Sequence, residues 1–466
     1  MVWLAGYFMP LRAQFEPLMY DLHDNPSSVF SYPSRKAGGR FYVLTPLIPH
    51  IQLQYKLSGP TPYDLLAADG RDFNLKWQET LNAITRNQGL LWETKFHLLA
   101  FGINKEAKTY RGGLYAQGQT WVFHAPSLYR FALYGNSDAS SRIDLSELHF
   151  NAEFVYTLYF GMSMPLGDGD SRWGFNVKLY NSAGTVSSTS NKGEIYYVPG
   201  QNNYYTHVFD NIDLEIRSSG LRKLMFEDNM GNKNVDSAAV VHDFMRRFGG
   251  TGNWGLGLDI GLEKPLSDAW TWSVNVEDLG IIRYADDNFS LRAHGHYRYE
   301  GVQVQFPDQP VDYWREIRDD FKQKIPTDTL TGVFYQWRPF KVYTSFRYTF
   351  GTAGGYNEYD CYYPWKSYAG EDEKPHSYMG WIGFYQNLAG RPYWGTGLYV
   401  HWIWARGFYT RLTLTTDSYT PFNAGLGLGG HIGPWHIYLM ADNLTGYLNA
   451  AASHGQYVAL GTYWSF

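Results

Sequence analysis

The chain has 466 residues, 44% of them hydrophobic, which suits either two or three soluble domains or one large β-barrel. Its formal net charge of -5 gives no basic footprint for nucleic acid, and a single cysteine, Cys361, excludes an intramolecular disulfide and any multi-cysteine metal site. Aromatic residues at 18% and 48 glycines favour strands and tight turns. This composition is typical of outer-membrane barrels and of secreted carbohydrate-binding β-proteins.

The N-terminal residues predict a segment that precedes the main fold. Residues 2–11 are an apolar run followed by Arg12 and Ala13, which predicts a signal-peptide remnant over 1–13; a buried first strand is the alternative. Residues 14–38 lack strand or helix periodicity and contain Asn25-Pro26. Because such a segment must satisfy its backbone polar groups in water or in a polar cavity, we expect an N-terminal plug or periplasmic segment there. Residues 39–466 would form the barrel.

From residue 39 onward, apolar and polar residues alternate with a period of two. In residues 254–263, for example, Trp254, Leu256 and Ile260 share one face, while Asp259 and Glu263 share the other. A face that meets lipid and a face that meets a wet lumen would produce this pattern. We count roughly fourteen to sixteen such strands, each near the length that a tilted membrane strand needs. The sequence thus predicts an all-β fold consisting of one transmembrane antiparallel barrel.

The polar faces mix small residues with charges of both signs, whereas a soluble sandwich would expose a face rich in lysine and glutamate. This mixture favours a confined lumen in which charges pair. The polar network that we expect in the lumen comprises Asp213, Glu215, Arg217, Asp259, Glu263, Glu277, Arg292, His294, His296, Arg298, Glu300 and Arg411.

Four stretches break the strand pattern and have helical spacing: residues 61–85, 126–134, 234–248 and 311–325. Helices between membrane strands belong outside the hydrocarbon layer or within the lumen. We expect these four to be lids, plugs or extracellular caps.

The last ten residues resemble a closing strand. Gly461, Trp464 and Phe466 end the chain with two large rings on one face, which water would disfavour and lipid would accept. Gly461, Trp464 and Phe466 are similar to the C-terminal signal of bacterial outer-membrane barrels. That resemblance implies outer-membrane lipid and the barrel-assembly machinery as partners.

The search for catalytic or metal-binding chemistry found no convincing site. His294 and His296 share a strand face at a spacing that can bind a metal, but the flanking Arg292 and Arg298 would oppose a cation. Salt bridges are the expected role of the carboxylates Asp259, Glu263 and Glu277. We therefore expect no enzyme activity, no metal and no cofactor.

Residues 131–145, residues 255–284 and the aromatic ending resemble an uncharacterised family of Bacteroidota outer-membrane β-barrels, which is similar to the long-chain fatty-acid transporter (FadL-like) superfamily. The resemblance implies one barrel of about fourteen strands with an N-terminal segment in the lumen. In those transporters an Asn-Pro-Ala sequence helps to form the hatch, whereas here Ser27 follows Asn25 and Pro26.

Three functions follow from these observations. The first is an outer-membrane channel or transporter for a small, hydrophobic molecule that passes through a plugged lumen. The second is a structural or accessory subunit of an envelope secretion or outer-membrane assembly complex, for which residues 356–378 would form a docking loop. The third is a secreted soluble glycan-binding β-protein, which rests on the aromatic content alone.

Overall fold

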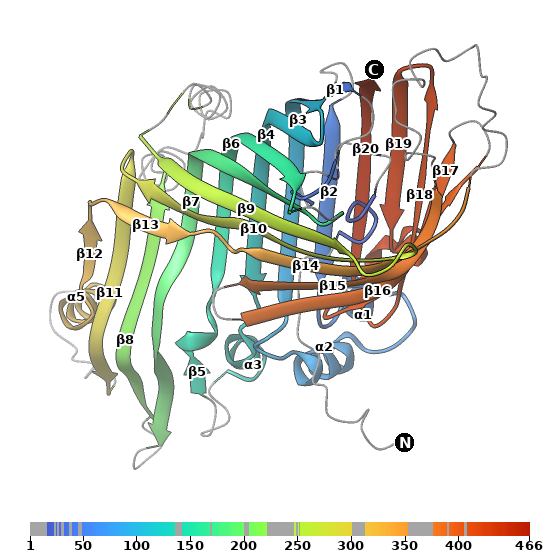
Figure 1. Ribbon diagram of the computed structural model, residues 1–466. Helices are drawn as coiled ribbons and strands as arrows, with labels where there is room; N and C mark the ends of the chain where they lie inside the picture. The colour runs from blue at the N-terminus through green and yellow to red at the C-terminus, as the bar shows by residue number, and fades with distance from the viewer. Residues whose placement is uncertain are drawn as a thin grey trace, which may run out of the picture.

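The computed structural model describes residues 16–22, 25, 28, 32–36, 40–44, 49–135, 142–167, 170–199, 205–220, 247, 250, 252–300, 313–352, 376–388, 391–404 and 408–466. Their strands form one antiparallel sheet that closes on itself (Figure 1). The strands of the closed ring are β1 (Phe41–Leu44), β2 (His50–Leu57), β3 (Gly89–Lys105), β4 (Lys108–Phe123), β6 (Phe150–Pro165), β7 (Arg172–Pro199), β9 (Trp254–Pro265), β10 (Trp270–Tyr284), β14 (Lys341–Thr352), β15 (His376–Leu388), β16 (Arg391–Ile403), β17 (Tyr409–Asp417), β18 (Asn423–Ile432), β19 (Trp435–Asp442) and β20 (Gly455–Ser465).

The ring has fourteen positions, because β1 and β2 both lie between β20 and β3 and together fill one of them. From β3 to β20, each strand of the ring pairs with the strand that follows it in that list. The backbone of the last residue completes the closure, since Phe466 donates to the Phe41 carbonyl at 2.8 Å and accepts from the Arg40 amide at 2.7 Å. The predicted all-β barrel of about fourteen strands is confirmed.

Apolar side chains point outward from the ring and polar ones point inward. On β9, Leu256 is 64% exposed while the neighbouring inward residue Asp259 is fully buried. Trp464 on β20 and Phe466, which follows β20, are exposed on the outside. Gly461 faces inward, where an added Cβ would overlap the Tyr438 hydroxyl. An apolar outer belt around a polar interior is the arrangement of an outer-membrane barrel.

The two ends of the barrel differ. One end, which we call the short-turn end, carries the tight turns β3–β4, β9–β10 and β18–β19 and the C-terminus. The other, the long-loop end, carries α1 (Pro62–Leu66), α2 (Phe73–Ala83) and α3 (Pro126–Tyr134), as Figure 1 shows. Two 3-10 helices (Leu444–Tyr447 and Ala450–Ala452) lie in the connection from β19 to β20 at the same end. None of the helices in the described ranges is long and apolar enough to cross a membrane.

Three of the four predicted helical stretches are confirmed. Residues 61–85 form α1 and α2, residues 126–134 form α3, and residues 311–325 contain α5 (Tyr313–Lys324). Asp72 begins α2, because its carboxylate accepts hydrogen bonds from the Asn74 and Leu75 amides at 2.8 and 3.2 Å. The fourth stretch, 234–248, lies outside the described residues except for residue 247, and the predicted signal-peptide remnant, 1–13, lies outside them entirely.

A side branch leaves the ring at β7. The first part of β7 pairs with β9, whereas its second part, from Thr185 to Pro199, pairs with β8 (Tyr205–Ser219). β8 pairs with β11 (Asn288–Tyr299), and β11 pairs with β12 (Thr327–Leu330). We call β8, β11, β12 and α5, with the second part of β7 and β5 (Arg142–Asp144), the wing. β13 (Phe334–Trp337) follows the wing and pairs with the end of β10.

The wing corrects part of the sequence interpretation. The apolar face of β8 and β11 does not meet lipid, because Ile212 and Tyr297 are buried in a small core with Ile325 and Phe321 from the α5 region. The opposite face, which holds Arg292 and His294, is exposed rather than lumenal. Alternation distinguishes two faces of a strand but not what covers each of them.

A charge on the outer belt tests the lipid contact. Leu398, in the middle of β16, is 60% exposed, and Leu330, on the wing, is 49% exposed. We expect Leu398→Arg to lower the free energy of unfolding in lipid vesicles by about 2–4 kcal/mol, because the cation would enter hydrocarbon. Leu330→Arg should change it by less than about 0.5 kcal/mol. Equal effects in urea titrations would contradict the assignment of the belt to lipid.

Candidate functional site

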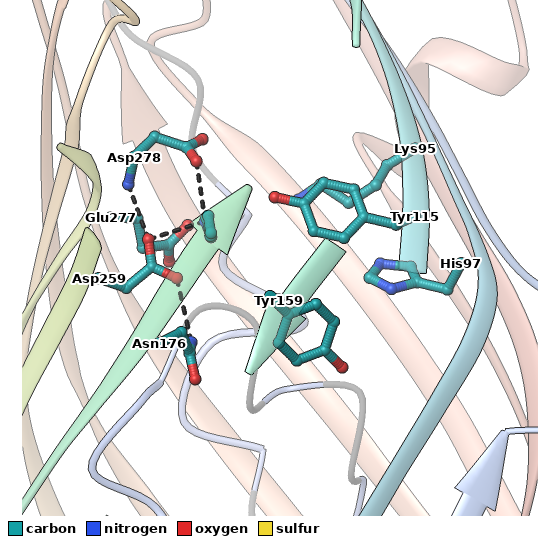
Figure 2. A pocket seen from close by; sticks show the side chains of 9 residues that line it. Lys95, His97, Tyr115, Tyr159, Asn176, Asp259, Glu277 and Asp278 are labelled. Carbon is teal, nitrogen blue, oxygen red and sulfur yellow. Dashed lines mark hydrogen bonds and ion pairs between the residues drawn. The ribbon is translucent and has the colours of Figure 1, made fainter. Parts of the chain in front are cut away.

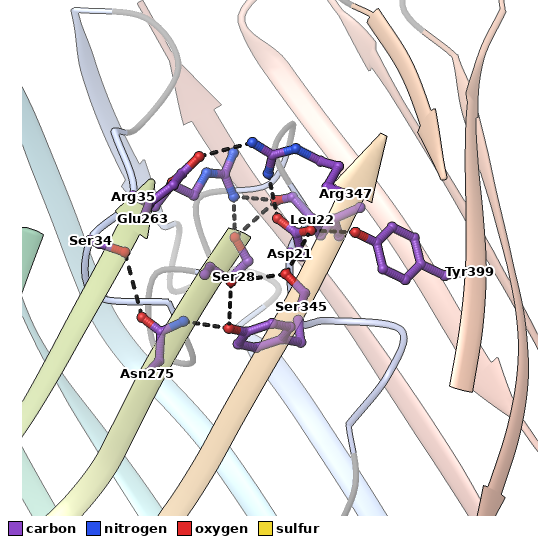
Figure 3. Close-up of polar contacts among 12 residues, drawn as sticks. Asp21, Leu22, Ser28, Ser34, Arg35, Glu263, Asn275, Ser345, Arg347 and Tyr399 are labelled. Atoms are coloured by element: carbon purple, nitrogen blue, oxygen red, sulfur yellow. Dashed lines mark hydrogen bonds and ion pairs between the residues drawn. The ribbon is translucent and has the colours of Figure 1, made fainter. Parts of the chain in front are cut away.

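An irregular segment near the N-terminus lies inside the ring. We call its described residues, 16–22, 25, 28 and 32–36, the plug; all but Lys36 are buried. The plug contacts side chains of β4, β6, β10, β14, β16 and β17, which lie on different sides of the lumen. Figure 3 shows the contacts with β10, β14 and β16. Because no strand ladder pairs its backbone with the wall, its polar groups need other partners.

Arg35 holds the plug together from within. Its guanidinium donates to the carbonyl oxygens of Leu22 and Asn25 and to Ser28 Oγ, and the bond to Asn25 measures 2.8 Å. Ser28 Oγ in turn donates to the same two carbonyls, at 2.9 Å each. The buried Arg35 guanidinium therefore joins Leu22, Asn25 and Ser28 of the irregular backbone. The neighbour of Asn25, Pro26, lies outside the described residues.

Three arginines on three wall strands bind the plug. Arg411 on β17 donates to the carbonyl oxygens of Pro17, Tyr20 and Asp21, at 3.1, 2.7 and 3.3 Å. Arg111 on β4 donates to the carbonyls of Pro33 and Arg35. Guanidinium groups suit this role because they offer five donors and stay charged. We call Arg111, Arg347 and Arg411 the wall arginines.

The third wall arginine, Arg347 on β14, pairs with a carboxylate instead. It lies 2.5 Å from Asp21 and 2.8 Å from Glu263 on β9. Asp21 is fully buried and also accepts from Tyr399 on β16 and from Ser345 Oγ at 3.3 Å, as Figure 3 shows. Its backbone has φ of 54°, which is uncommon for a residue other than glycine. Removing one partner of such a pair leaves an uncompensated buried charge.

One side of the lumen is a network of charges. Lys178 on β7 lies 2.7 Å from Asp259 and 2.8 Å from Asp278. Lys341 lies 3.2 Å from Glu93 and 3.7 Å from Glu16 of the plug, so the plug takes part in this network. The cavity in Figure 2 has a volume of about 10 Å³, near the space of one water molecule. It is lined by Lys95, His97, Tyr115, Tyr159, Asn176, Lys178, Asp259, Glu277 and Asp278.

The other side of the lumen is aromatic. One continuous cluster of buried rings and aliphatic side chains runs from the plug toward the long-loop end, where β3 begins and β4 and β15 end. Within it the ring centroids of Tyr20 and Tyr343 are 4.7 Å apart, and those of Tyr343 and Phe384 are 4.5 Å apart. We call this cluster the aromatic column: Tyr20, Tyr32, Leu91, Trp121, Phe123, Tyr343, Tyr378, Ile382, Phe384, Leu388, Tyr393, Tyr399 and Tyr419.

A comparison with protein families places most of the chain in one family. Residues 33–442 match the model of DUF5723, described as a family of unknown function. The chain belongs to the DUF5723 family. No curated protein matches the chain in sequence.

Solved structures that align with the chain share little sequence with it. A FadL homologue from Pseudomonas aeruginosa is 10% identical, with 95% of this chain and 94% of that chain covered and a TM-score of 0.43. The toluene transporter TbuX of Ralstonia pickettii is 9% identical, with 95% and 94% covered and a TM-score of 0.40. The toluene transporter TodX of Pseudomonas putida is 7% identical, with 94% and 93% covered and a TM-score of 0.39. The function of this DUF5723 member is therefore argued from its own geometry.

The polar network predicted from sequence divides between two places. Asp259, Glu263, Glu277 and Arg411 are buried in the lumen or partly so. The other eight were placed wrongly, because they lie on the wing, outside the ring: Asp213, Glu215, Arg217, Arg292, His294, His296, Arg298 and Glu300.

On the wing these residues form exposed pairs. Arg292 lies 2.9 Å from Asp213, and this hydrogen bond lowers the pKa of the Asp213 carboxyl. His296 lies 3.0 Å from Asp210. Among the described residues no group of three or more histidine, cysteine, aspartate or glutamate side chains could hold a metal ion.

Sequence reasoning missed Asp21, Arg35, Arg111 and Arg347. Arg347 could have been found, since it alternates with outward residues in the run from Lys341 to Thr352. Asp21 and Arg35 lie in a segment without periodicity, so no sequence pattern marked them.

A glycine of the wall tests how closely the plug fits. A Cβ added to Gly174 on β7 would overlap the Pro33 carbonyl, whereas one added to Gly332, beside the wing, would meet no atom within 4 Å. We expect Gly174→Ala to displace the end of the plug and to raise the rate of proteolysis within it about tenfold or more, since backbone cannot yield cheaply. Gly332→Ala should leave the rate unchanged. Limited proteolysis in mild detergent measures both, and equal rates would contradict the seated plug.

Proposed function

We propose that this DUF5723 protein is an outer-membrane channel for a small, largely apolar molecule, and that the plug is its closed gate. The observation that carries the proposal is the way in which the plug is held. Its described residues contribute no strand to the sheet, and side chains of the wall bind them through hydrogen bonds and ion pairs. The ring of strand pairs would therefore remain complete if the plug moved.

The aromatic column supports the apolar character of the cargo. It offers a continuous series of rings from the long-loop end to the plug, and rings bind apolar surface without demanding hydrogen bonds from it. The charged side of the lumen offers no such path, because its cations and carboxylates are already paired with one another. By this proposal the long-loop end faces the outside and the short-turn end faces the periplasm.

The wall arginines set how often the gate opens. A hydrogen bond to a charged group contributes about 1.5–3 kcal/mol, and about 1.4 kcal/mol changes an equilibrium tenfold. We therefore expect Arg347→Ala combined with Arg411→Ala to raise the leak of small solutes from vesicles by roughly tenfold to a hundredfold. Arg292→Ala, which removes an exposed arginine paired on the wing, is the matched control and should leave the leak unchanged.

Whole cells test the nature of the cargo. In the double variant the uptake of an apolar fluorescent probe such as N-phenylnaphthylamine should rise more than the uptake of a sugar of similar size. Uptake equal to that of the wild type, with the barrel folded in the outer membrane, would contradict the channel.

A second candidate, a docking subunit of an envelope complex, is favoured by the free edge of the wing. All four residues of β12 are exposed, and its described strand pairing is with β11 on one side. Because the His294 amide donates to the Pro326 carbonyl, the antiparallel pattern turns the backbone groups of Thr327 and Thr329 away from β11. An open edge of this kind can accept a strand from another protein.

Proline substitutions in β12 test the docking function. Thr329→Pro would remove an outward amide without breaking the pairing to β11, whereas Asp328→Pro would break that pairing. We expect any stoichiometric partner that purifies with the wild type in mild detergent to be lost with Thr329→Pro. A partner retained by Thr329→Pro would contradict edge docking.

A further inference from the structure

Tyr20 of the plug occupies a slot that the wall itself builds. Its ring stacks on Tyr343 of β14 with an angle of 11° between the ring planes. Its hydroxyl lies 3.0 Å from Ser273 Oγ and accepts from Asn275 Nδ2, both on β10. Asn275 pairs directly with Tyr343, and Ser273 with Ser345, across the two strands. Two adjacent cross-strand pairs thus provide a flat aromatic floor and a polar end.

The polar end has a defined hydrogen-bond direction. The Asp21 carboxylate can only accept, so Ser345 donates to it and Ser273 donates to Ser345, at 3.3 and 2.8 Å. Ser273 is then left to accept from the Tyr20 hydroxyl, while the Asn275 amide donates to the same oxygen (Figure 3). When Tyr20 and Asp21 leave together, the Ser273 hydroxyl can still accept and Asn275 Nδ2 can still donate, so the slot complements a group that donates one hydrogen bond and accepts one, which is a hydroxyl.

We propose that the slot formed by Ser273, Asn275 and Tyr343 is a binding site for hydroxyl-bearing aromatic molecules, and that Tyr20 fills it as an internal surrogate while the gate is closed. The inference rests on the proposed channel and specifies its cargo. The slot lies where the aromatic column meets the plug, so a ring that moves along the column reaches Tyr343 next to Tyr20. A molecule that replaces Tyr20 removes one of the contacts that hold the plug.

This competition links the cargo to the gate. The slot holds either Tyr20 or the cargo, so the cargo binds only the state in which Tyr20 has left. Binding then shifts the population toward the open state, by an amount set by the difference in affinity for the two states. An aromatic hydrocarbon without a hydroxyl would leave Ser273 and Asn275 without a partner and would bind more weakly.

A chemical complementation experiment tests the slot. Tyr20→Ala removes a phenol-sized group from the slot. The matched control, Tyr32→Ala, removes the same group from a neighbouring buried tyrosine of the plug, whose ring centroid lies 5.4 Å from that of Tyr20. Phenol and benzene are titrated against each purified full-length variant in detergent, and the apparent dissociation constant is taken from the shift in unfolding temperature. We expect phenol to bind Tyr20→Ala at least tenfold more tightly than benzene.

Several outcomes would overturn the slot. If phenol stabilises Tyr32→Ala as strongly as Tyr20→Ala, or if benzene binds Tyr20→Ala as tightly as phenol does, the binding is partitioning into a void. Adding Ser273→Ala and Asn275→Ala to Tyr20→Ala should abolish the preference for phenol, and a retained preference would contradict the assigned polar end.

A second variant keeps the proposal testable if Tyr20→Ala does not fold. Tyr20→Phe retains the ring and loses the hydroxyl, so phenol should open its gate at a concentration about tenfold lower than it opens the wild type. The same opening concentration for both would overturn the competition.

The channel and the slot can fail separately. If the double variant of Arg347 and Arg411 leaks but Tyr20→Ala does not select phenol, the slot is wrong and the channel stands. If phenol binds Tyr20→Ala selectively while the double variant does not leak, the channel is overturned and the slot stands as a binding site alone.

Discussion

The structure depends on one constraint: an irregular backbone inside a membrane barrel must find a hydrogen-bond partner for its carbonyl groups. Arg411 alone satisfies three carbonyls of the plug, and Arg111 satisfies two more from another side of the lumen. Arg35 does the same from within. The registers of β4 and β17 therefore have to bring Arg111 and Arg411 to the heights at which the plug exposes its carbonyls, and the register of β14 has to bring Arg347 to the Asp21 carboxylate.

The lumen has two chemically different sides, and the plug contacts both. Glu16 joins the charged network through Lys95 and Lys341, whereas Tyr20 enters the aromatic column through Tyr343. Charges buried at this density are stable only when paired, which makes the charged side rigid. The aromatic side is held by stacking and edge contacts, which allow one ring to replace another. This division explains why we assign passage to the aromatic side.

The wing depends on a fork in the wall, and Asn253 holds that fork. Its carbonyl accepts from the Ser182 amide of β7 at 3.0 Å, and its side chain reaches Ser219 of β8 at 2.9 Å and the Ala285 amide after β10, also at 2.9 Å. Asn253 is fully buried. Its hydrogen bonds thus take the place of strand-to-strand backbone hydrogen bonds at the point where β7 changes its partner from β9 to β8. β7 can serve two partners in succession because it is 28 residues long and its pairing with β8 contains bulges.

The sequence by itself determined the class of fold. Alternation with a period of two, an aromatic closing strand and helical breaks at 61–85, 126–134 and 311–325 are local patterns, and they predicted the barrel, its outer face and three helical stretches. Tertiary structure alone decided which strands belong to the ring, because β8 and β11 alternate as the wall strands do yet pair outside it. It also decided the site. Asp21 and Arg347 are 326 positions apart and meet only when fourteen strand positions close around the plug, and no local pattern encodes a contact of that range.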